Sequence, residues 1–349
     1  MANPMNEERS QKIIANWVFI GVGMLIVQVL LGGITRLTGS GLSITEWKPI
    51  MGALPPMNEA AWQTAFEKYR QIAQYKYINN HFTLSDFKFI YFWEWFHRNW
   101  GRLIGIAFAI PFIYFLVKGY FRKWMVMPLV ILFLLGGLQG AIGWIMVQSG
   151  LNDQDVYVSH IRLAVHFIAA MVLICYALVF GMKLTVRKRD LITSSSLWNF
   201  TLPVFVLLML QLIYGAFMAG LRAATVAPTW PDMNGTFVPD IAGESWVNSH
   251  LAVHFIHRTI AYILLLMLIG WWILARRYRE SRLFNRLRNW VLVLVIVQVT
   301  LGVLAVLNSL NIVRGKFGVF ESLALLHQVT GMVLLLVLTA AFYLTRWSY

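Results

Sequence analysis

The sequence predicts an all-α polytopic membrane protein with eight transmembrane helices arranged as two repeated four-helix bundles. The first observation is composition: 59% of the 349 residues are hydrophobic and 13% are charged, which is far more apolar than a soluble domain. The second is length, because a helix needs about 20 apolar residues to cross about 30 Å of hydrocarbon. Runs of this kind fall near 14–36, 98–117, 125–147, 161–182, 198–220, 255–275, 289–308 and 322–345.

The distribution of charge predicts the orientation and argues against nucleic-acid binding, despite a net charge of +14. Sixteen Lys and Arg but only four acidic residues lie in the two tails and the loops after the second, fourth and sixth spans. The other side carries thirteen Lys and Arg and eleven acidic residues. By the positive-inside rule, both termini are expected in the cytoplasm.

The N-terminal segment and the cysteine content narrow the class further. The stretch "MANPMNEERSQK" resembles neither a cleavable signal nor a transit peptide, so the first span is expected to be a retained anchor in a bacterial inner (plasma) membrane. Cys175 is the single cysteine, which excludes an intramolecular disulfide. No Cys-x-x-Cys-His motif occurs, so covalent haem attachment is also excluded.

The odd-numbered spans share a Gln followed four residues later by a Gly. These pairs are Gln28 and Gly32, Gln139 and Gly143, Gln211 and Gly215, and Gln298 and Gly302. Residues four apart share a helix face, where Gly permits close helix approach and Gln can bond across the contact. One such pair is ordinary packing, but four on alternate spans indicate a repeated unit.

The even-numbered spans each carry a histidine near their beginning, namely His97, His166, His257 and His327. The offsets between halves are 160 residues from His97 to His257 and 161 from His166 to His327. A duplicated four-helix unit explains this agreement. We therefore expect an N-terminal half at 1–190 and a C-terminal half at 191–349.

Two histidines from different helices at one depth are what ligation of a planar macrocycle by two imidazoles requires. A single histidine in a membrane helix is more often a packing residue or a proton relay. Two depth-matched pairs favour haem in both halves. Zinc is less suitable, because no Cys, Asp or Glu accompanies all four sites.

Charged neighbours distinguish the two halves. Glu94 precedes His97 by three residues, whereas His254 precedes His257 by three, so one half can perform chemistry while the other holds a cofactor. Arg162 lies one turn outward of His166 and is a candidate for binding a haem propionate, because Arg grips carboxylates. Arg98 and Arg258 are weaker candidates for the same role, and snorkelling to lipid headgroups is the alternative for all three.

The first outer loop, 37–97, is long and begins with turn-forming Gly and Pro residues. Asn58 is expected to cap a helix with Trp62, Phe66 and Tyr69 on one face, lying on the membrane surface or on the bundle. The segment 83–98 is expected to continue into the second span. The loop containing "APTWPDMNG" (227–235) is a candidate lid.

These segments together resemble the haem A synthase family over almost the whole chain. The resemblance rests on "GGITRLTGSGLS", "EWFHRNWGR", "QGAIGWIMVQSGL", "TWPDMNG", "FIHRTIAY" and "LLHQVTG". Some members carry a cysteine pair in the first outer loop, which this chain lacks. It therefore resembles the proteobacterial and mitochondrial branch.

The resemblance implies oxidation of the C8 methyl group of haem o to a formyl group, giving haem a for terminal oxidases. It implies that His97 and His166 flank the substrate haem iron, with Glu94 beside it as a catalytic residue. The alternative for Glu94 is an ion pair with Arg98 or another arginine at the interface. His257 and His327 would ligate the iron of a haem b cofactor. The protein's task is then placement, ligation and electrostatics.

Two other functions remain open from the sequence. A two-haem b-type, quinol-linked electron-transfer cytochrome explains the four histidines equally well, but not the difference between Glu94 and His254. A transporter suits eight spans with repeats, although the repeats here are parallel. Haem o, membrane lipid, a redox partner, a haem o synthase and a second copy of the chain are the expected partners.

Overall fold

The computed structural model describes residues 4–48, 51–313 and 317–346. Within these residues, eight helices are long and apolar enough to cross a membrane. They are α1 (Pro4–Leu37), α3 (Leu84–Val117), α4 (Lys123–Gln148), α5 (His160–Thr185), α6 (Ser195–Leu221), α7 (His250–Ala275), α8 (Arg282–Leu307) and α9 (Val319–Leu344). All eight predicted spans are confirmed, and the chain is an all-α polytopic membrane protein.

The second span begins earlier than its apolar run, as the continuity of 83–98 predicts. Thr83 and Asp86 form a capping box in which the Thr83 N–H donates to the Asp86 carboxylate at 2.9 Å and the Asp86 N–H donates to the Thr83 hydroxyl at 3.3 Å. This satisfies N–H groups that a helix start leaves without partners. The helix then continues without a break to Val117, so Glu94 and His97 lie on one continuous helix with the apolar run.

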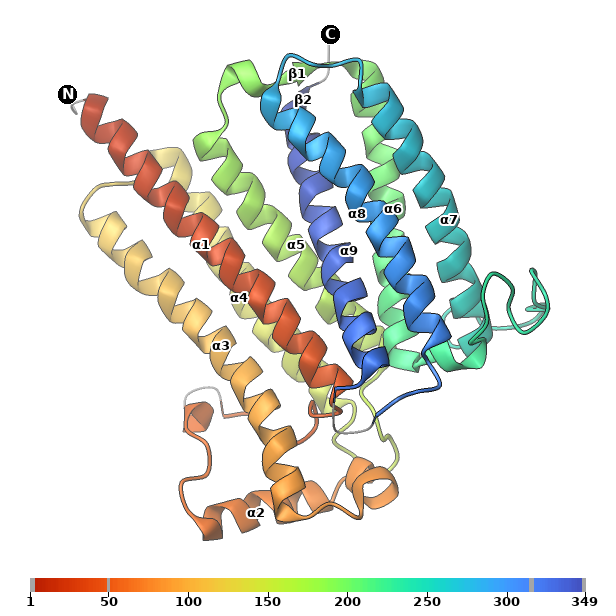
Figure 1. The fold of residues 1–349 in the computed structure, drawn as a ribbon. Coiled ribbons are helices and arrows are strands. Elements are labelled where there is room, and N and C mark those ends of the chain that lie inside the picture. Colours follow the sequence, from red (N-terminus) through yellow and green to blue (C-terminus); the bar gives the residue numbers. More distant parts are fainter. Residues whose placement is uncertain (1–3, 49–50, 314–316, 347–349) are drawn as a thin grey trace.

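The described helices pack in two groups, which meet where α5 contacts α6 and α9 (Figure 1). In the first group α1 contacts α3 and α5, and α4 contacts α3 and α5. In the second, α6 packs on α7, α7 on α8 and α8 on α9. Helix α9 also contacts α1 and α5, so one apolar core continues between the groups. That the two groups arose by duplication stays a prediction.

A small unit outside the spans covers one end of the first group (Figure 1). It contains helix α2 (Glu59–Arg70) and the short turns η1 (Met51–Ala53) and η2 (Tyr75–Asn79). Asn58 caps α2 by accepting the Ala61 N–H at 2.8 Å, as predicted. The Phe66 ring stacks on Phe87 of α3 with centroids 5.0 Å apart, so α2 packs on the bundle.

A salt bridge ties the segment that follows α1 to this unit. Glu46 pairs with Lys68 of α2 at 2.8 Å and with Lys48 at 2.9 Å. Hydrogen bonds from Lys68 and Lys48 hold the pKa of Glu46 below its usual range. The carboxylate is therefore charged at neutral pH, although exposed pairs of this kind stabilise a fold only slightly.

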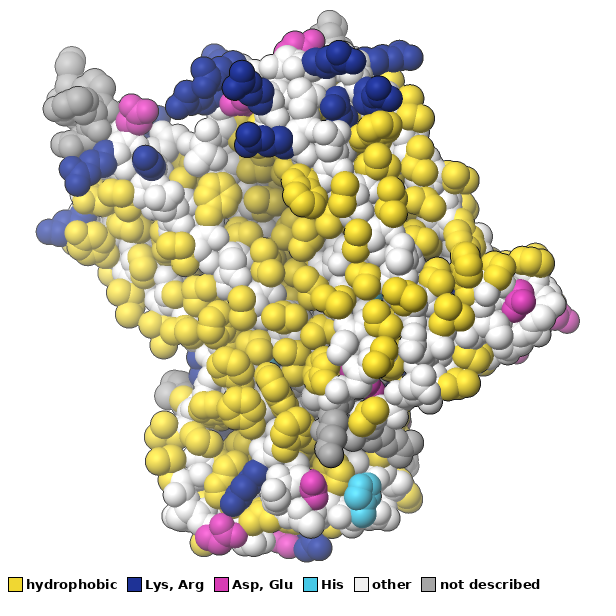
Figure 2. Space-filling model, in the orientation of Figure 1, with side chains coloured by type: hydrophobic (Ala, Val, Ile, Leu, Met, Phe, Trp, Pro, Cys, Tyr) yellow, Lys and Arg dark blue, Asp and Glu magenta, His cyan; other side chains and the backbone are white. Residues whose placement is uncertain are grey.

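The opposite end of the molecule is basic. Helix α1 begins and α9 ends there, beside the two-residue strands β1 (Ile192–Thr193) and β2 (Thr345–Arg346) and the turn η3 (Lys188–Asp190) (Figure 1). Figure 2 shows Lys and Arg side chains concentrated at this end above a broad apolar band. The structure thus gathers the charges from which the sequence predicted the cytoplasmic side.

Candidate functional site

The four predicted histidines lie on four different helices. His97 is on α3, His166 on α5, His257 on α7 and His327 on α9. Each imidazole side chain is half-buried, although it lies within a membrane-spanning helix. The histidines fall into two pairs, one in each helix group.

The pair in the second group is close enough to share one metal ion. The ring centroids of His257 and His327 are 6.4 Å apart, and the rings are inclined at 76°. Two metal–nitrogen bonds of about 2.0–2.1 Å, extended to the ring centres, span roughly 6 Å. The separation therefore suits two imidazoles on one iron, which is the arrangement expected for a b-type haem.

The pair in the first group is held by helices α1 and α4. The His97 ring lies against Gly32 of α1, and the His166 ring lies against Gly143 of α4. The Gln28 amide donates to the His97 backbone carbonyl at 3.3 Å, and the Gln139 amide donates to the His166 backbone carbonyl at 3.0 Å. The two glutamines thus anchor the two histidine-bearing helices at the level of the histidines.

The glutamines of the second group contact the imidazole rings directly. The Gln211 amide lies 3.4 Å from Nε2 of His257, and the Gln298 amide lies 3.2 Å from Nε2 of His327. Nδ1 of His327 donates to the Gln298 carbonyl at 2.9 Å. This hydrogen bond assigns the proton to Nδ1 and leaves the lone pair on Nε2, the state that a metal ligand requires.

Glu94 is buried, with 3% of its surface exposed, and both of its oxygens are bound. Oε2 accepts the Ser43 hydroxyl at 2.7 Å and the Ile44 N–H at 2.8 Å. Oε1 pairs with the Arg98 guanidinium one turn along α3. The carboxylate therefore lies one turn before His97 on α3 and also fastens the segment that follows α1 to this helix.

His254, at the corresponding position of the second group, is fully buried and carries a different partner set. Its Nε2 accepts a hydrogen bond from Nε of Arg258 at 2.9 Å. The Arg258 guanidinium also donates to the carbonyls of Ala227, Thr229 and Asp232 at 2.8–2.9 Å. The Arg258 side chain thus fastens the predicted lid loop to α7, and the neutral His254 ring supports Arg258.

Turn chemistry holds the same loop in shape. The Thr229 hydroxyl donates to the Asp232 carboxylate at 2.6 Å, and the Gly235 N–H donates to it at 3.1 Å. These two hydrogen bonds keep the pKa of Asp232 below its usual range. A charged Asp232 therefore stabilises the 229–235 turn at neutral pH.

The three arginines predicted to bind propionates are all bonded to protein groups. Arg98 donates to the carbonyls of Ile44 and Glu46 at 2.9 and 3.1 Å, and Arg258 holds the lid loop as described above. Arg162 is exposed and donates to the Ile145 carbonyl at 2.9 Å. Their binding of a propionate stays a prediction, and their shown role is to secure the backbone at the outer ends of the helices.

The donor set fits haem ligated by histidine better than a bare metal ion. Among the described residues, no three His, Cys, Asp or Glu side chains cluster in a way that could hold a metal. Buried polar atoms without a partner in the described part of the chain do occur beside the histidines. They are the Oε1 atoms of Gln28, Gln139, Gln211 and Gln298, Nε1 of Trp93 and Nδ1 of His257. Of these, the Trp93 N–H is a donor of the kind that a haem propionate accepts from.

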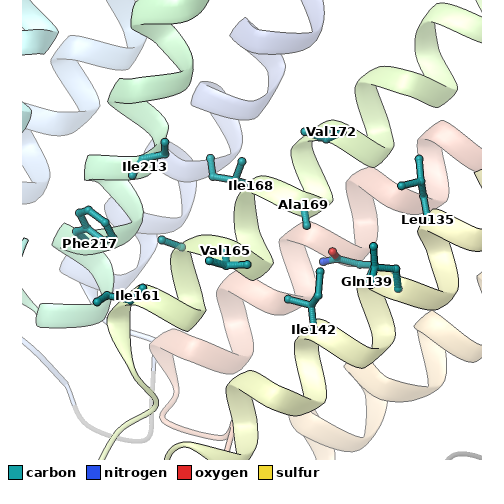
Figure 3. A pocket seen from close by; sticks show the side chains of 12 residues that line it. Leu135, Gln139, Ile142, Ile161, Val165, Ile168, Ala169, Val172, Ile213 and Phe217 are labelled. Atoms are coloured by element: carbon teal, nitrogen blue, oxygen red, sulfur yellow. The ribbon is translucent and has the colours of Figure 1, made fainter.

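An apolar groove of about 430 Å³ lies between α4, α5 and α6 (Figure 3). Its lining is apolar except for Gln139, and it includes Val165, Val172 and Phe217. The Val165 and Val172 side chains are about half exposed, at 52% and 49%. Gln139 also lies 3.2 Å from Nδ1 of His166, so it connects the groove to the first histidine pair.

Sequence reasoning missed two parts of the site. Ser43 and Ile44, which bind Glu94, lie 51 and 50 residues away along the chain, and no local pattern relates them to it. The sequence predicts that each Gln–Gly pair packs on a neighbouring helix, but it does not say on which residue. In the structure each pair packs on the histidine of that helix. The equal number of Gln–Gly pairs and span histidines, four of each, could have indicated this contact.

Comparison with known proteins agrees with this geometry. The COX15-CtaA family, described as cytochrome oxidase assembly protein, matches residues 15–339. One relative named haem A synthase, from Parvibaculum lavamentivorans, is 44% identical, and the match covers 83% of this chain and 85% of that protein. The relative of Rhodospirillum centenum is 38% identical, and the match covers 99% of this chain and 91% of that protein. The relative of Rhodopseudomonas palustris (strain HaA2) is 40% identical, and the match covers 91% of this chain and 86% of that protein. The chain belongs to the COX15-CtaA family of cytochrome oxidase assembly proteins.

Proposed function

We propose that this protein is a haem A synthase, which oxidises the C8 methyl group of haem o to a formyl group to give haem a. The observation that carries the proposal is the presence of two histidine pairs, one in each helix group, in a chain whose relatives bear that name. Conversion of a methyl group and one water molecule to a formyl group releases four electrons and four protons, and the four electrons pass to a membrane electron acceptor as a partner. The protein is then an oxidoreductase acting on a CH group.

The two pairs have different tasks in this proposal. His97 and His166 bind the substrate haem o, and His257 and His327 bind haem b. When bound, haem b supplies one-electron transfer. His327 is prepared for ligation by its Nδ1–H bond to the Gln298 carbonyl, and Arg258 holds the loop 227–232 over the outer end of α7.

Glu94 supplies the chemical difference between the halves. Removal of electrons from a methyl group on a conjugated ring develops positive charge, which a carboxylate stabilises when water is partly excluded. In the absence of reaction, the Arg98 guanidinium pairs with the Glu94 carboxylate and balances its negative charge. His254 at the matching position is neutral when it accepts from Arg258, so the second pair lacks this charge and suits a cofactor.

A two-haem b electron-transfer cytochrome is the second candidate, and the names of the relatives disfavour it. An electron carrier leaves haem o unchanged. The proposed function also includes two protein partners, a haem o synthase in direct contact and a second copy of this chain.

We further propose that the substrate enters from the lipid along the groove beside Gln139. Haem o carries a long farnesyl tail and partitions into the membrane. The groove is open and apolar, and its volume lies within the 300–1,000 Å³ typical of ligand pockets. Gln139 links this groove to His166, which provides a route from lipid to ligand.

The orientation proposed for this function places the basic end in the cytoplasm and the histidines toward the outer leaflet of a bacterial inner membrane. In intact cells with Cys175→Ala, a membrane-impermeant maleimide should label Asp240→Cys in the loop after α6. It should not label Glu280→Cys in the loop after α7. The reverse pattern would overturn the orientation.

Haem analysis of histidine variants tests the assignment of the two pairs. Membranes that contain the wild-type chain and a haem o synthase should yield haem a and haem b. His257→Ala or His327→Ala should remove most of the low-spin b-type absorbance, because one axial imidazole is lost. His97→Ala or His166→Ala should abolish haem a while largely preserving haem b.

Recovery of only haem b and haem o with the wild-type chain would contradict the enzymatic function. Unchanged haem b content in both His257→Ala and His327→Ala would contradict the cofactor assignment. Fold is checked in each case by the yield of detergent-extracted monodisperse protein.

Replacement of Glu94 separates a catalytic charge from a loop anchor. Glu94→Gln keeps the shape but deletes the charge, so we expect haem a formation to fall about 100-fold, within the range for lost general acid–base or charge stabilisation. Haem b should be retained. Ser43→Ala removes one hydrogen bond to the same carboxylate and keeps its charge, so it should retain most activity.

Equal losses in Glu94→Gln and Ser43→Ala would show that Glu94 acts only by fastening the outer loop. Wild-type yield of haem a from Glu94→Gln would show that the carboxylate charge is dispensable.

The entry route is tested by filling the groove. Val172→Trp should lower haem a formation at limiting haem o about tenfold, the factor that corresponds to about 1.4 kcal/mol of lost binding. The rate at saturating haem o and the haem b content should be unchanged. Val206→Trp on α6 is the matched control, because Val206 is 59% exposed and does not line the groove.

If Val172→Trp and Val206→Trp have the same effect, or neither has any, substrate does not use the groove.

A further inference from the structure

Each of the four histidine rings lies against the α-carbon of a glycine on a neighbouring helix. A Cβ placed on Gly143 would lie 2.8 Å from Cε1 of His166, and one on Gly302 would lie 2.9 Å from Cε1 of His327. The corresponding distances are 3.0 Å from Gly32 to His97 and 3.4 Å from Gly215 to His257. The same ring atom is nearest in all four cases.

The contact is specific to the rings. At these four glycines the atoms nearest to the Cβ position are all imidazole atoms of the facing histidine. Other glycines of the same helices behave differently. A Cβ on Gly137 or Gly140 of α4, or on Gly21 or Gly23 of α1, meets no described atom within 4 Å. Helix packing alone therefore does not account for the four glycines.

The position of Cε1 makes this contact consequential. Cε1 lies between Nδ1 and Nε2, so a surface that fixes this atom also fixes the directions of both nitrogens. The glutamine one turn earlier binds the same histidine at its backbone or ring. The glycine thus sets how closely the imidazole ring approaches the neighbouring helix. The glutamine sets the position of the histidine along the axis of that helix.

We propose that Gly32, Gly143, Gly215 and Gly302 are positioning residues that set the orientation of the four iron-ligating imidazoles. This inference rests on the proposed function for the identity of the bound group, but its steric part concerns only this chain. Groups that orient a histidine ligand tune the affinity and potential of the metal it holds.

The distances predict a graded response to alanine. Real Cβ contacts essentially never fall below 3.0 Å, so Gly143→Ala and Gly302→Ala must displace a ring. At 3.4 Å, Gly215→Ala makes an ordinary van der Waals contact and should be tolerated. Alanine forms helices better than glycine, so a loss of stability cannot come from helix propensity.

The first test uses Tm in a double-mutant cycle, with the C-terminal haem site left intact. Gly143→Ala should lower the Tm of the purified protein, and Gly140→Ala on the same helix should not. In a His166→Ala background, where the ring is absent, Gly143→Ala should no longer lower the Tm. An equal Tm decrease in both backgrounds would overturn the steric part of the inference.

The second test uses the spectrum and potential of bound haem b, which a merely structural role would not move. Gly302→Ala should weaken haem b retention about 10–100-fold, as substitutions around metal ligands do, and shift the low-spin electron paramagnetic resonance signal and midpoint potential. Gly215→Ala should change these quantities much less. A wild-type signal, potential and retention in Gly302→Ala would overturn the inference.

The outcomes separate this inference from the proposed function. If wild-type protein binds no haem but the Tm cycle behaves as expected, the glycines position the rings and the haem assignment is wrong. If wild-type protein binds haem and Gly302→Ala binds it identically, the proposed function stands and the positioning role is wrong.

Discussion

The contact between each imidazole and the helix beside it is the constraint on which this structure depends. A polar ring within a membrane helix needs partners from the protein, because hydrocarbon offers none. Here the partner is a glycine and a glutamine one turn apart on the neighbouring helix. The glycine admits the ring, and the glutamine binds the histidine that carries it. This requirement brings together α1 with α3, α4 with α5, α6 with α7 and α8 with α9.

The two helix groups use one arrangement with different chemistry beside their histidine pairs. In each, an arginine directly after a histidine of the pair donates to loop carbonyls and pairs with the residue three before that histidine. That residue is a carboxylate in the first group and an imidazole in the second. The loops are thereby secured beside both histidine pairs, while a carboxylate lies next to the first pair and an imidazole next to the second. In the proposed function, this difference separates a reactive site from a cofactor site.

Sequence patterns predicted most of the fold, because membrane spans depend on local composition. The eight apolar runs, the cap at Asn58 and the continuation of 83–98 into the second span are all present. Sequence also identified Glu94 and the four histidines as candidates. It did not identify Ser43 as a partner of Glu94, since that contact joins residues 51 positions apart. Nor did it assign the glycines to the rings, because a helical period places a residue on a face without naming its neighbour.

The ratio of haem to polypeptide tests most directly the claim that each histidine pair holds its own macrocycle. Protein purified from cells without a haem o synthase should contain one haem b per chain, held by His257 and His327. Protein from cells with that enzyme should contain the same haem b and, in addition, haem o or haem a at the first pair. Two haem b per chain under both conditions would contradict the account and indicate an electron carrier.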